Sequence, residues 1–350
     1  MLRVPDYYKD FKCTAEKCRD NCCIGWEIDI DERTMEYYRS VQGEMGERLR
    51  SDISLEATPH FILGENERCP FLNDCNLCDI ILTLGEEHIC DICTRHPRYV
   101  NRFGDLTEMG VGLACEEAAR LILSSEEADS FCLESSENAP VADDEEFDEE
   151  LLKALLEARE RIFKILADRS APLSERLLCV LDFAAALQEE LMCGVDEYLF
   201  EFIREYEPSC EFETQDSKNA VWNFYRTLES VGADWDKLSA PPLPLCGGLN
   251  EIEGEHLAVY FIFRYFLKAV FDSDAYSRAA FAILSVGIIS LLCSGKTEPA
   301  HRADIAHIYS KEIEYSDENV NALLDALCFD ESFSLESLAG LVHSAFDTCL

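Results

Sequence analysis

The chain has 350 residues, 48% of them hydrophobic, which is enough for the cores of about two or three compact units. With 70 acidic and 30 basic residues its net charge is −40, so most of its surface repels a phosphate backbone and no nucleic-acid partner is expected. The same charge attracts a lysine-bearing protein, although a surface that only maintains solubility would have this composition too.

The first residues and the cysteines together indicate a cytoplasmic metal protein. Residues 1–8 become polar too early for the apolar segment of a signal peptide, so a cytoplasmic location is expected. In a reducing cytosol, cysteines serve as metal ligands or redox groups more often than as disulfides. Ten of the 18 cysteines fall between Cys13 and Cys115, and the other eight are scattered singly, as ordinary buried thiols are.

The first cysteine motif is Cys13-x4-Cys18-x3-Cys22-Cys23. Thiolates at this spacing on a loop can converge on one soft metal ion. Two adjacent cysteines bind a single ion only with strain, so one of the vicinal pair is expected to serve elsewhere.

Further cysteines follow at Cys69, Cys75 and Cys78 and in the pair Cys90-x2-Cys93. The apolar runs between them are short and interrupted, so residues 1–123 are predicted to form a loop-rich module held by metal, with helices at 31–40 and 115–124. Sulfur sites suit zinc and iron alike, but ligands that come from separated segments favour an iron–sulfur cluster over zinc.

Three arginines lie close together after the last of these pairs, namely Arg95, Arg98 and Arg102. They form a cationic spot that is suited to the carboxylate or phosphate of a cofactor, and Arg95 and Arg98 are the candidate cofactor-binding residues. Pairing with neighbouring acidic residues is the alternative. His96 is expected to be hydrogen-bonded rather than a ligand.

The remainder of the chain is predicted to be an acidic linker followed by helices. Residues 124–150 hold twelve acidic residues and no Lys or Arg, which opposes packing. In residues 151–350 apolar side chains recur at helical spacing, which predicts an α-helical domain. Its most apolar run, 279–293, has 15 residues, fewer than the ~20 of a membrane span, so we predict a buried helix and no membrane contact.

Several common enzyme motifs do not occur. No Gly-x-Gly-x-x-Gly turn follows a strand and no phosphate-binding loop ends in Gly-Lys-Ser/Thr, which argues against Rossmann-type methyltransferases and common ATPases. Cys18-x3-Cys22-Cys23 only approaches the Cys-x3-Cys-x2-Cys signature of radical enzymes.

Over roughly residues 1–125, the order and spacing of these motifs resemble the flagellin lysine-N-methylase family. The motifs that carry the resemblance are Pro5-Asp6-Tyr7-Tyr8, Phe11-x-Cys13, Cys18-x3-Cys22-Cys23-x-Gly25-Trp26, Cys69-Pro70-Phe71-Leu72, Leu77-Cys78-x-Ile80, Leu84-Gly85-Glu86-Glu87, Cys93 before Pro97-Arg98, and Cys115 before Glu117-Ala118-Ala119-Arg120.

The resemblance implies a protein lysine N-methyltransferase that uses S-adenosylmethionine and a four-iron four-sulfur cluster, with flagellin as the substrate. It places Cys75 and Cys90 outside the shared pattern and singles out no catalytic residue among the nearby carboxylates Glu86, Glu87, Asp29 and Asp31. The metal ligands that it implies are drawn from Cys13, Cys18, Cys22, Cys23, Cys69, Cys78, Cys93 and Cys115.

The expected architecture is mainly α, with the cysteine-rich, metal-bound module packed on the helical domain and an active cleft between the two. The alternative is a protein of another class, a non-enzymatic interaction or redox module that binds zinc or an iron–sulfur cluster.

Overall fold

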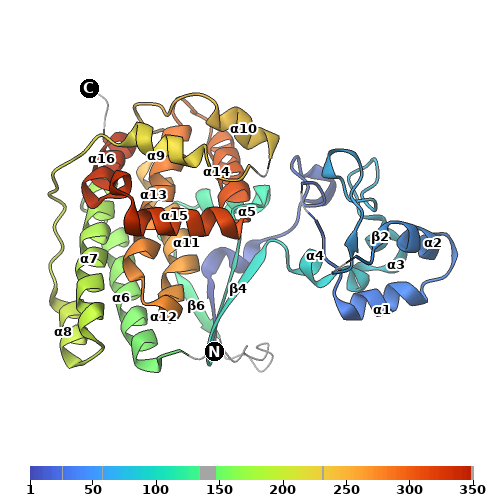
Figure 1. Ribbon diagram of the computed structural model, residues 1–350, viewed down its shortest axis with the longest axis horizontal. Helices are drawn as coiled ribbons and strands as arrows, with labels where there is room; N and C mark the ends of the chain where they lie inside the picture. Colours follow the sequence, from blue (N-terminus) through green and yellow to red (C-terminus); the bar gives the residue numbers. More distant parts are fainter. Residues whose placement is uncertain (26, 57, 135–146, 231, 348–350) are drawn as a thin grey trace.

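Two separate hydrophobic cores organise the chain. The structure is a computed structural model that describes residues 1–25, 27–56, 58–134, 147–230 and 232–347. It is mainly helical, as predicted, and also contains a small sheet. Figure 1 shows a small lobe, coloured blue, that projects from a larger body made of the sheet and most of the helices.

The lobe is built from short elements around a core that includes Ile28, Tyr38 and Phe71. Its first helix begins after Asp31, whose carboxylate accepts a hydrogen bond from the Thr34 amide, and the predicted helix at 31–40 is confirmed. The lobe elements are α1 (Glu32–Ser40), α2 (Gly43–Ser51), the antiparallel pair β2 (Ile53–Ser54) and β3 (His60–Phe61), α3 (Asp79–Leu84) and α4 (Asp91–Arg95).

A four-stranded sheet with the order β4-β5-β1-β6 lies in the body. β1 pairs parallel to β5, whereas β4 with β5 and β1 with β6 are antiparallel. This sheet was not predicted, although Gly104, with φ of +56°, marks the tight turn between β4 and β5. The strands are β1 (Leu2–Pro5), β4 (Arg98–Phe103), β5 (Leu106–Val111) and β6 (Phe131–Glu134).

Helices form most of the described part of residues 151–350, so the predicted helical character of this region is confirmed. The body helices are α5 (Glu116–Leu123), α6 (Glu149–Ala167), α7 (Leu173–Cys193), α8 (Glu197–Glu205), α9 (Lys218–Tyr225), α10 (Ala233–Ser239), α11 (Glu251–Tyr265), α12 (Ala269–Asp272), α13 (Ala275–Leu292), α14 (Pro299–Ile313), α15 (Asp317–Phe329) and α16 (Leu335–Phe346).

Helix α13 is the central helix of the body. It is long and apolar enough to cross a membrane by length and composition, but 94% of this window is buried inside the protein. Figure 1 shows it surrounded by other helices of the body, among them α11, α15 and α16. The prediction of a buried helix is therefore confirmed.

The predicted module at residues 1–123 is divided between the two cores. Phe11, Phe103 and Ile122 belong to the core of the body, whereas the core of the lobe runs from Ile28 to Cys90. The predicted acidic linker at 124–150 lies in part outside the described residues. Its described ends form β6 and the start of α6.

Candidate functional site

Three cysteines lie immediately before helices. Cys78, Cys90 and Cys115 precede α3, α4 and α5. Burial raises the pKa of Cys78 and Cys115, and backbone amides of the first helical turns, which donate to the two sulfurs, offset part of this rise. A helix N-terminus favours the thiolate, which is the metal-binding form of cysteine.

Five cysteines gather in the lobe, and we call them the lobe group. Burial raises the pKa of Cys69 to about 11, and the charges of Cys78 and Cys90 raise it further. The pKa of Cys93 is raised first by its hydrogen bond with Cys90, then by burial and by the charges of Cys90, Cys23 and Cys69. The lobe group is Cys23, Cys69, Cys78, Cys90 and Cys93.

Four cysteines gather where the lobe joins the body, and we call them the junction group. Burial raises the pKa of Cys18 to about 11, with Glu116, Cys22 and Cys13 adding to the effect of burial. Burial raises the pKa of Cys115 to about 12, and the charges of Cys18 and Cys13 act in the same direction. The junction group is Cys13, Cys18, Cys22 and Cys115.

The vicinal pair lies at the boundary between the two groups. Cys22 and Cys23 share a hydrogen bond, but Cys22 neighbours Cys18 whereas Cys23 neighbours Cys69 and Cys78. The two thiols therefore face different groups of cysteines, and the expectation that one of them serves elsewhere than the other as a metal ligand stays a prediction. The eight cysteines that the resemblance implied thus divide into four in each group, and Cys90 joins the lobe group as a fifth thiol.

The donor chemistry of both groups fits a thiophilic metal, because each supplies at least four cysteine sulfurs. Among the described residues, no three His, Cys, Asp or Glu side chains are arranged closely enough to hold a metal ion. The sulfurs are therefore neighbours rather than a closed coordination shell. Metal binding would require the thiols to lose their protons and draw together.

The remaining cysteines differ from these groups. Cys75 is exposed in the lobe. Of the eight scattered cysteines, Cys349 lies outside the described residues. The expectation that they are buried thiols is wrong for four of the other seven, because three are exposed and one is disulfide-bonded. The exposed ones are Cys132, Cys193 and Cys328, and the disulfide-bonded one is Cys246.

The two arginines predicted to bind a cofactor contact different partners. Arg95 lies in α4 and pairs with Asp91 at 3.5 Å. The guanidinium of Arg98 lies 5.3 Å from the centre of the Phe11 ring. His96 is half-buried, and this burial lowers its pKa to about 4, so it is neutral near pH 7.

Charged side chains fasten the lobe to the body. The Asp20 carboxylate lies 2.6 Å from Nε2 of His307 and 2.9 Å from Nζ of Lys311, and both partners lie on α14. Arg19 bridges Glu116 at 2.9 Å and also pairs with Asp304. These contacts hold the segment of Cys18 and Cys22 against α5 and α14.

A cavity of about 420 Å³ opens at the same junction. Tyr315 lines it and also neighbours Cys115 and Cys22, so the cavity adjoins the junction group. Four of its eight lining residues are acidic and none is basic, which suits a cationic ligand. The lining residues are Gly25, Glu67, Glu229, Ser230, Tyr315, Ser316, Asp317 and Glu318.

The carboxylates of this cavity were not identified from the sequence. They come from the lobe, from the segment after α9 and from the start of α15, and no local pattern links such distant positions. The carboxylates that the sequence analysis named near the cysteines are not in the lining; these are Asp29, Asp31, Glu86 and Glu87. Asp31, for example, accepts hydrogen bonds from the amides of Thr34 and Asp91 and has a structural role.

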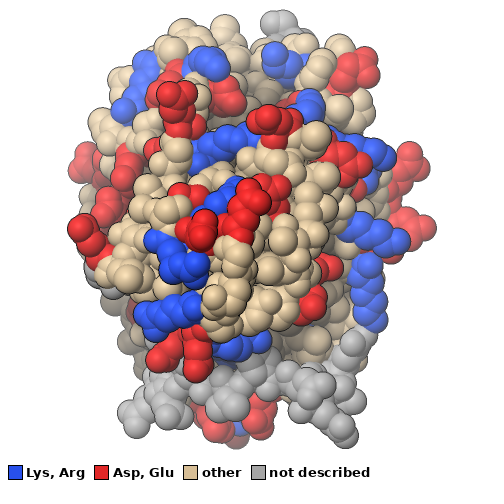
Figure 2. Space-filling model, turned by 90° about the vertical axis from the view of Figure 1, so that its right-hand side faces the viewer, with Lys and Arg blue, Asp and Glu red and all other residues tan. Residues whose placement is uncertain are grey.

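The outer end of the lobe is not uniformly acidic. Figure 2 shows Lys and Arg side chains interspersed with Asp and Glu on this face. The charge that suits a cationic ligand is therefore a local property of the cavity lining.

Comparison with known proteins places residues 249–341 in a defined family. They match the FliB lysine N-methylase C-terminal domain, which here comprises α11 to α16. The match lies in the helical body, in addition to the cysteine motifs of residues 1–125. Tyr315, Asp317 and Glu318 of the junction cavity lie within it.

Relatives with related names share part of the chain. The lysine-N-methylases of Salmonella choleraesuis and Salmonella typhimurium are each 28% identical over 131 residues, covering 35% of this chain and 33% of theirs. The flagellar biosynthetic protein FliU of Salmonella muenchen is 28% identical over 131 residues, covering 35% of this chain and 78% of its own. The match thus spans about a third of the length of the two lysine-N-methylases. No solved structure matches the chain.

Proposed function

Because this chain belongs to the flagellin lysine-N-methylase family, we propose that it is a protein lysine N-methyltransferase that transfers methyl groups from S-adenosylmethionine to lysine ε-amines. The observation that carries the proposal is the carboxylate-lined cavity at the junction of the lobe and the body. This cavity joins the two features that point to the family, the cysteine motifs and the FliB C-terminal domain.

The cavity has the charge that a lysine side chain requires. Glu229, Asp317 and Glu318 surround a space into which a lysine ammonium can enter and form charge-assisted hydrogen bonds. The amine attacks a methyl group only when neutral, so it must then lose its proton. A carboxylate can accept that proton, and the cationic sulfonium of the donor would lower the pKa of a nearby amine.

The two cysteine groups are the sites we propose for metal. The junction group would hold an iron–sulfur cluster, because it has four sulfurs and adjoins the cavity. When bound, such a cluster would hold the segments of the junction group together beside the cavity. The lobe group would bind a second metal, with zinc as the alternative to iron, and stabilise the lobe.

The substrate that we propose is a lysine-bearing protein of the flagellin type, met in the cytoplasm. The names of the relatives, lysine-N-methylase and flagellar biosynthetic protein, support this class. The net charge of −40 favours encounter with a basic segment of such a partner.

Methyl transfer can be measured directly. The chain, purified without oxygen, is incubated with S-adenosylmethionine and flagellin, and methyl-lysine is quantified by mass spectrometry. Asp317→Asn and Glu229→Gln should each raise the KM for the protein substrate at least about tenfold, because each removes a carboxylate from the lysine cavity.

Glu197→Gln is the matched control, because Glu197 is an exposed carboxylate in the first turn of α8 and lies outside the cavity lining. It should leave KM unchanged. If the wild-type protein contains its metal and still forms no methyl-lysine, the proposed activity is refuted. Equal KM values in Asp317→Asn, Glu229→Gln and Glu197→Gln would refute the role of the cavity but not the methyltransferase activity.

Metal analysis tests the two cysteine groups. Iron, sulfide and zinc are measured in the wild type, in Cys115→Ser and in Cys69→Ser. If each group holds its own centre, each variant should lose one centre and retain the other. Loss of all metal in both variants would show a single shared centre, and full metal content in both would exclude these ligands.

A further inference from the structure

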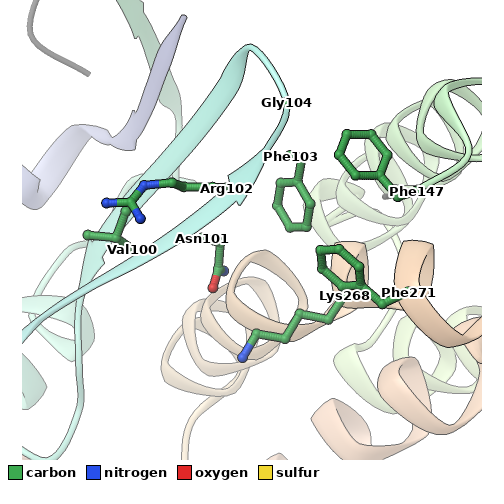
Figure 3. A pocket seen from close by; sticks show the side chains of 8 residues that line it. All are labelled: Val100, Asn101, Arg102, Phe103, Gly104, Phe147, Lys268 and Phe271. Carbon is green, nitrogen blue, oxygen red and sulfur yellow. The ribbon is translucent and has the colours of Figure 1, made fainter. Parts of the chain in front are cut away.

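A second cavity, of about 370 Å³, lies beside the turn between β4 and β5. Its volume is within the range of small-molecule sites. One wall comes from β4 and the turn, and the other from Phe147 before α6 and from the segment around α12. Figure 3 shows the side chains that line it. They are Val100, Asn101, Arg102, Phe103, Gly104, Phe147, Lys268 and Phe271.

Three phenylalanines form the apolar part of this cavity. The rings of Phe103 and Phe271 are stacked with centres 6.1 Å apart, and the rings of Phe147 and Phe271 meet edge to face at 6.2 Å. Phe271 is 44% exposed even though it lies among these rings. The exposed ring of Phe271, supported by the buried ring of Phe103, can bind a flat ring by stacking.

Lys268 provides a cation at the other part of the cavity. Figure 3 shows its side chain extending from the side of Phe271 toward Asn101, whereas the guanidinium of Arg102 points away from the three rings. No carboxylate lines the cavity, and within the described part of the chain none forms an ion pair with Lys268. Burial and the neighbouring charges of Arg264 and Arg278 together lower the pKa of Lys268 to about 8.

Asn101 adds a hydrogen-bond acceptor to the same cavity. Its amide nitrogen donates to the carbonyl oxygen of Arg264 at 2.8 Å, which fixes the orientation of the side chain. Its Oδ1 accepts no hydrogen bond from the described residues. An amino group on a flat ring is a suitable donor to this oxygen.

In a protein with a net charge of −40, a cavity without carboxylates that combines aromatic faces, an amide acceptor and an ammonium selects a specific class of ligand. We propose that this cavity binds a ligand in which a flat ring with an amino group is joined to an acidic group, the chemistry of adenosyl amino acids and adenine nucleotides. The ring lies on the phenylalanines, its amino group donates to Asn101, and the acidic group pairs with Lys268.

The two cavities have no lining residue in common, although the charge of Asp317, which lines the junction cavity, acts on Lys268. If the ligand is the methyl donor, the proposal rests on the proposed function. The cavity is then the donor site of a chain that has no glycine-rich nucleotide-binding turn. If the ligand is an adenine nucleotide, the cavity is a second site beside the transfer reaction.

Calorimetry with the full chain, purified without oxygen, tests the inference with S-adenosylhomocysteine, adenosine monophosphate and adenosine as the probes. At least one of the two compounds that carry an acidic group should bind at least about tenfold more tightly than adenosine, because only the carboxylate of S-adenosylhomocysteine or the phosphate of adenosine monophosphate can pair with Lys268. Tight binding of S-adenosylhomocysteine identifies the donor site, and tight binding of adenosine monophosphate alone identifies a nucleotide site.

Lys268→Met and Phe271→Ala should each weaken binding of that compound at least about tenfold. Lys237→Met and Phe329→Ala are the matched controls, since Lys237 lies in α10 and the 85% exposed Phe329 ends α15, both outside the cavity lining. Hydrogen exchange of the wild type is a measurement that needs no variant. Ligand should protect residues 100–104 and 268–271.

The inference is wrong if neither acidic compound binds at about 1 mM, or if Lys268→Met and Phe271→Ala bind as the wild type does. Binding without protection of these two segments would also place the ligand elsewhere. In either case methyl transfer by the wild type, measured separately, would leave the proposed function standing.

Discussion

The lobe and the body are stabilised in different ways. The core of the lobe holds 13 buried side chains, two of which are the cysteines Cys69 and Cys90. The core of the body extends over the sheet and most of the helices and includes the fully buried α13. Small cores seldom stabilise a fold unless disulfides or metals add to them, whereas larger cores do so by apolar burial.

This difference indicates a division of tasks. The body is stabilised by a large apolar core, and it includes the residues that match the FliB lysine N-methylase C-terminal domain. The lobe carries the lobe group and Gly25 and Glu67 of the junction cavity, so its folding and the assembly of that cavity are coupled to the state of its thiols. Selective damage to either part tests this view.

The largest effect is expected in the body. Arg159 and Glu108 form an ion pair at 2.8 Å, and both side chains are fully buried. Arg159→Met leaves Glu108 without its counter-ion and should lower the free energy of unfolding by about 3–5 kcal/mol, as measured by urea denaturation. Arg33→Met is the control, because the exposed pair of Arg33 with Asp91 contributes at most about 1 kcal/mol. Equal losses in the two variants would contradict this ranking.

The next effect should be confined to the lobe. Removal of bound metal with a chelator, or the substitution Cys69→Ser, should speed amide exchange across residues 28–93 by at least about tenfold while exchange in α13 is unchanged. Cys193→Ser, at an exposed thiol of the body, is the control. If α13 loses protection together with the lobe, the two parts are not independent.

Residue patterns predicted those features of the protein that depend on residues close together in the sequence. Helical periodicity and the cap at Asp31 identified most helices, and cysteine spacing identified the residues that gather in two groups. The Cys90-x2-Cys93 spacing also contained the signal for Cys90, which lies in the lobe group.

The parts that were missed depend on contacts between distant segments. β1 pairs with β5 and β6 across about a hundred residues or more, so no short-range pattern reveals the sheet. The carboxylates of the junction cavity, such as Glu67, Glu229 and Asp317, come together only after the lobe has docked on the body. The position of Phe271 in the second cavity likewise depends on the β4–β5 turn.

A smaller effect is expected at the contact between the two parts. Asp20→Asn removes the negative charge that His307 and Lys311 share, and because Asp20 is about a third exposed the loss should be about 1 kcal/mol. Faster exchange at residues 18–25 and in α14, with the lobe core still protected, would show loosened docking. Asp10→Asn, at an exposed carboxylate outside this contact, should have no effect. Unchanged exchange in Asp20→Asn would show that other contacts hold the lobe.

The smallest effect is the pH dependence of one amine, and it distinguishes the second cavity from the rest of the acidic surface. Burial, Arg264 and Arg278 lower the pKa of Lys268 to about 8, although Asp317 and Glu314 oppose them. A lysine reacts with acetic anhydride only as the neutral amine, so acetylation of Lys268 should reach half its maximum near pH 8. Acetylation of Lys237 should keep rising beyond pH 10, because the hydrogen bond with Asp234 raises its pKa above 10.5. Mass spectrometry of the competitively labelled chain follows the acetylation of both lysines.

An acidic ligand in the cavity favours the charged ammonium, so it should move the midpoint of Lys268 acetylation to higher pH and leave that of Lys237 in place. If, without ligand, the Lys268 profile follows that of Lys237, the amine of Lys268 is not held in an apolar, cationic setting.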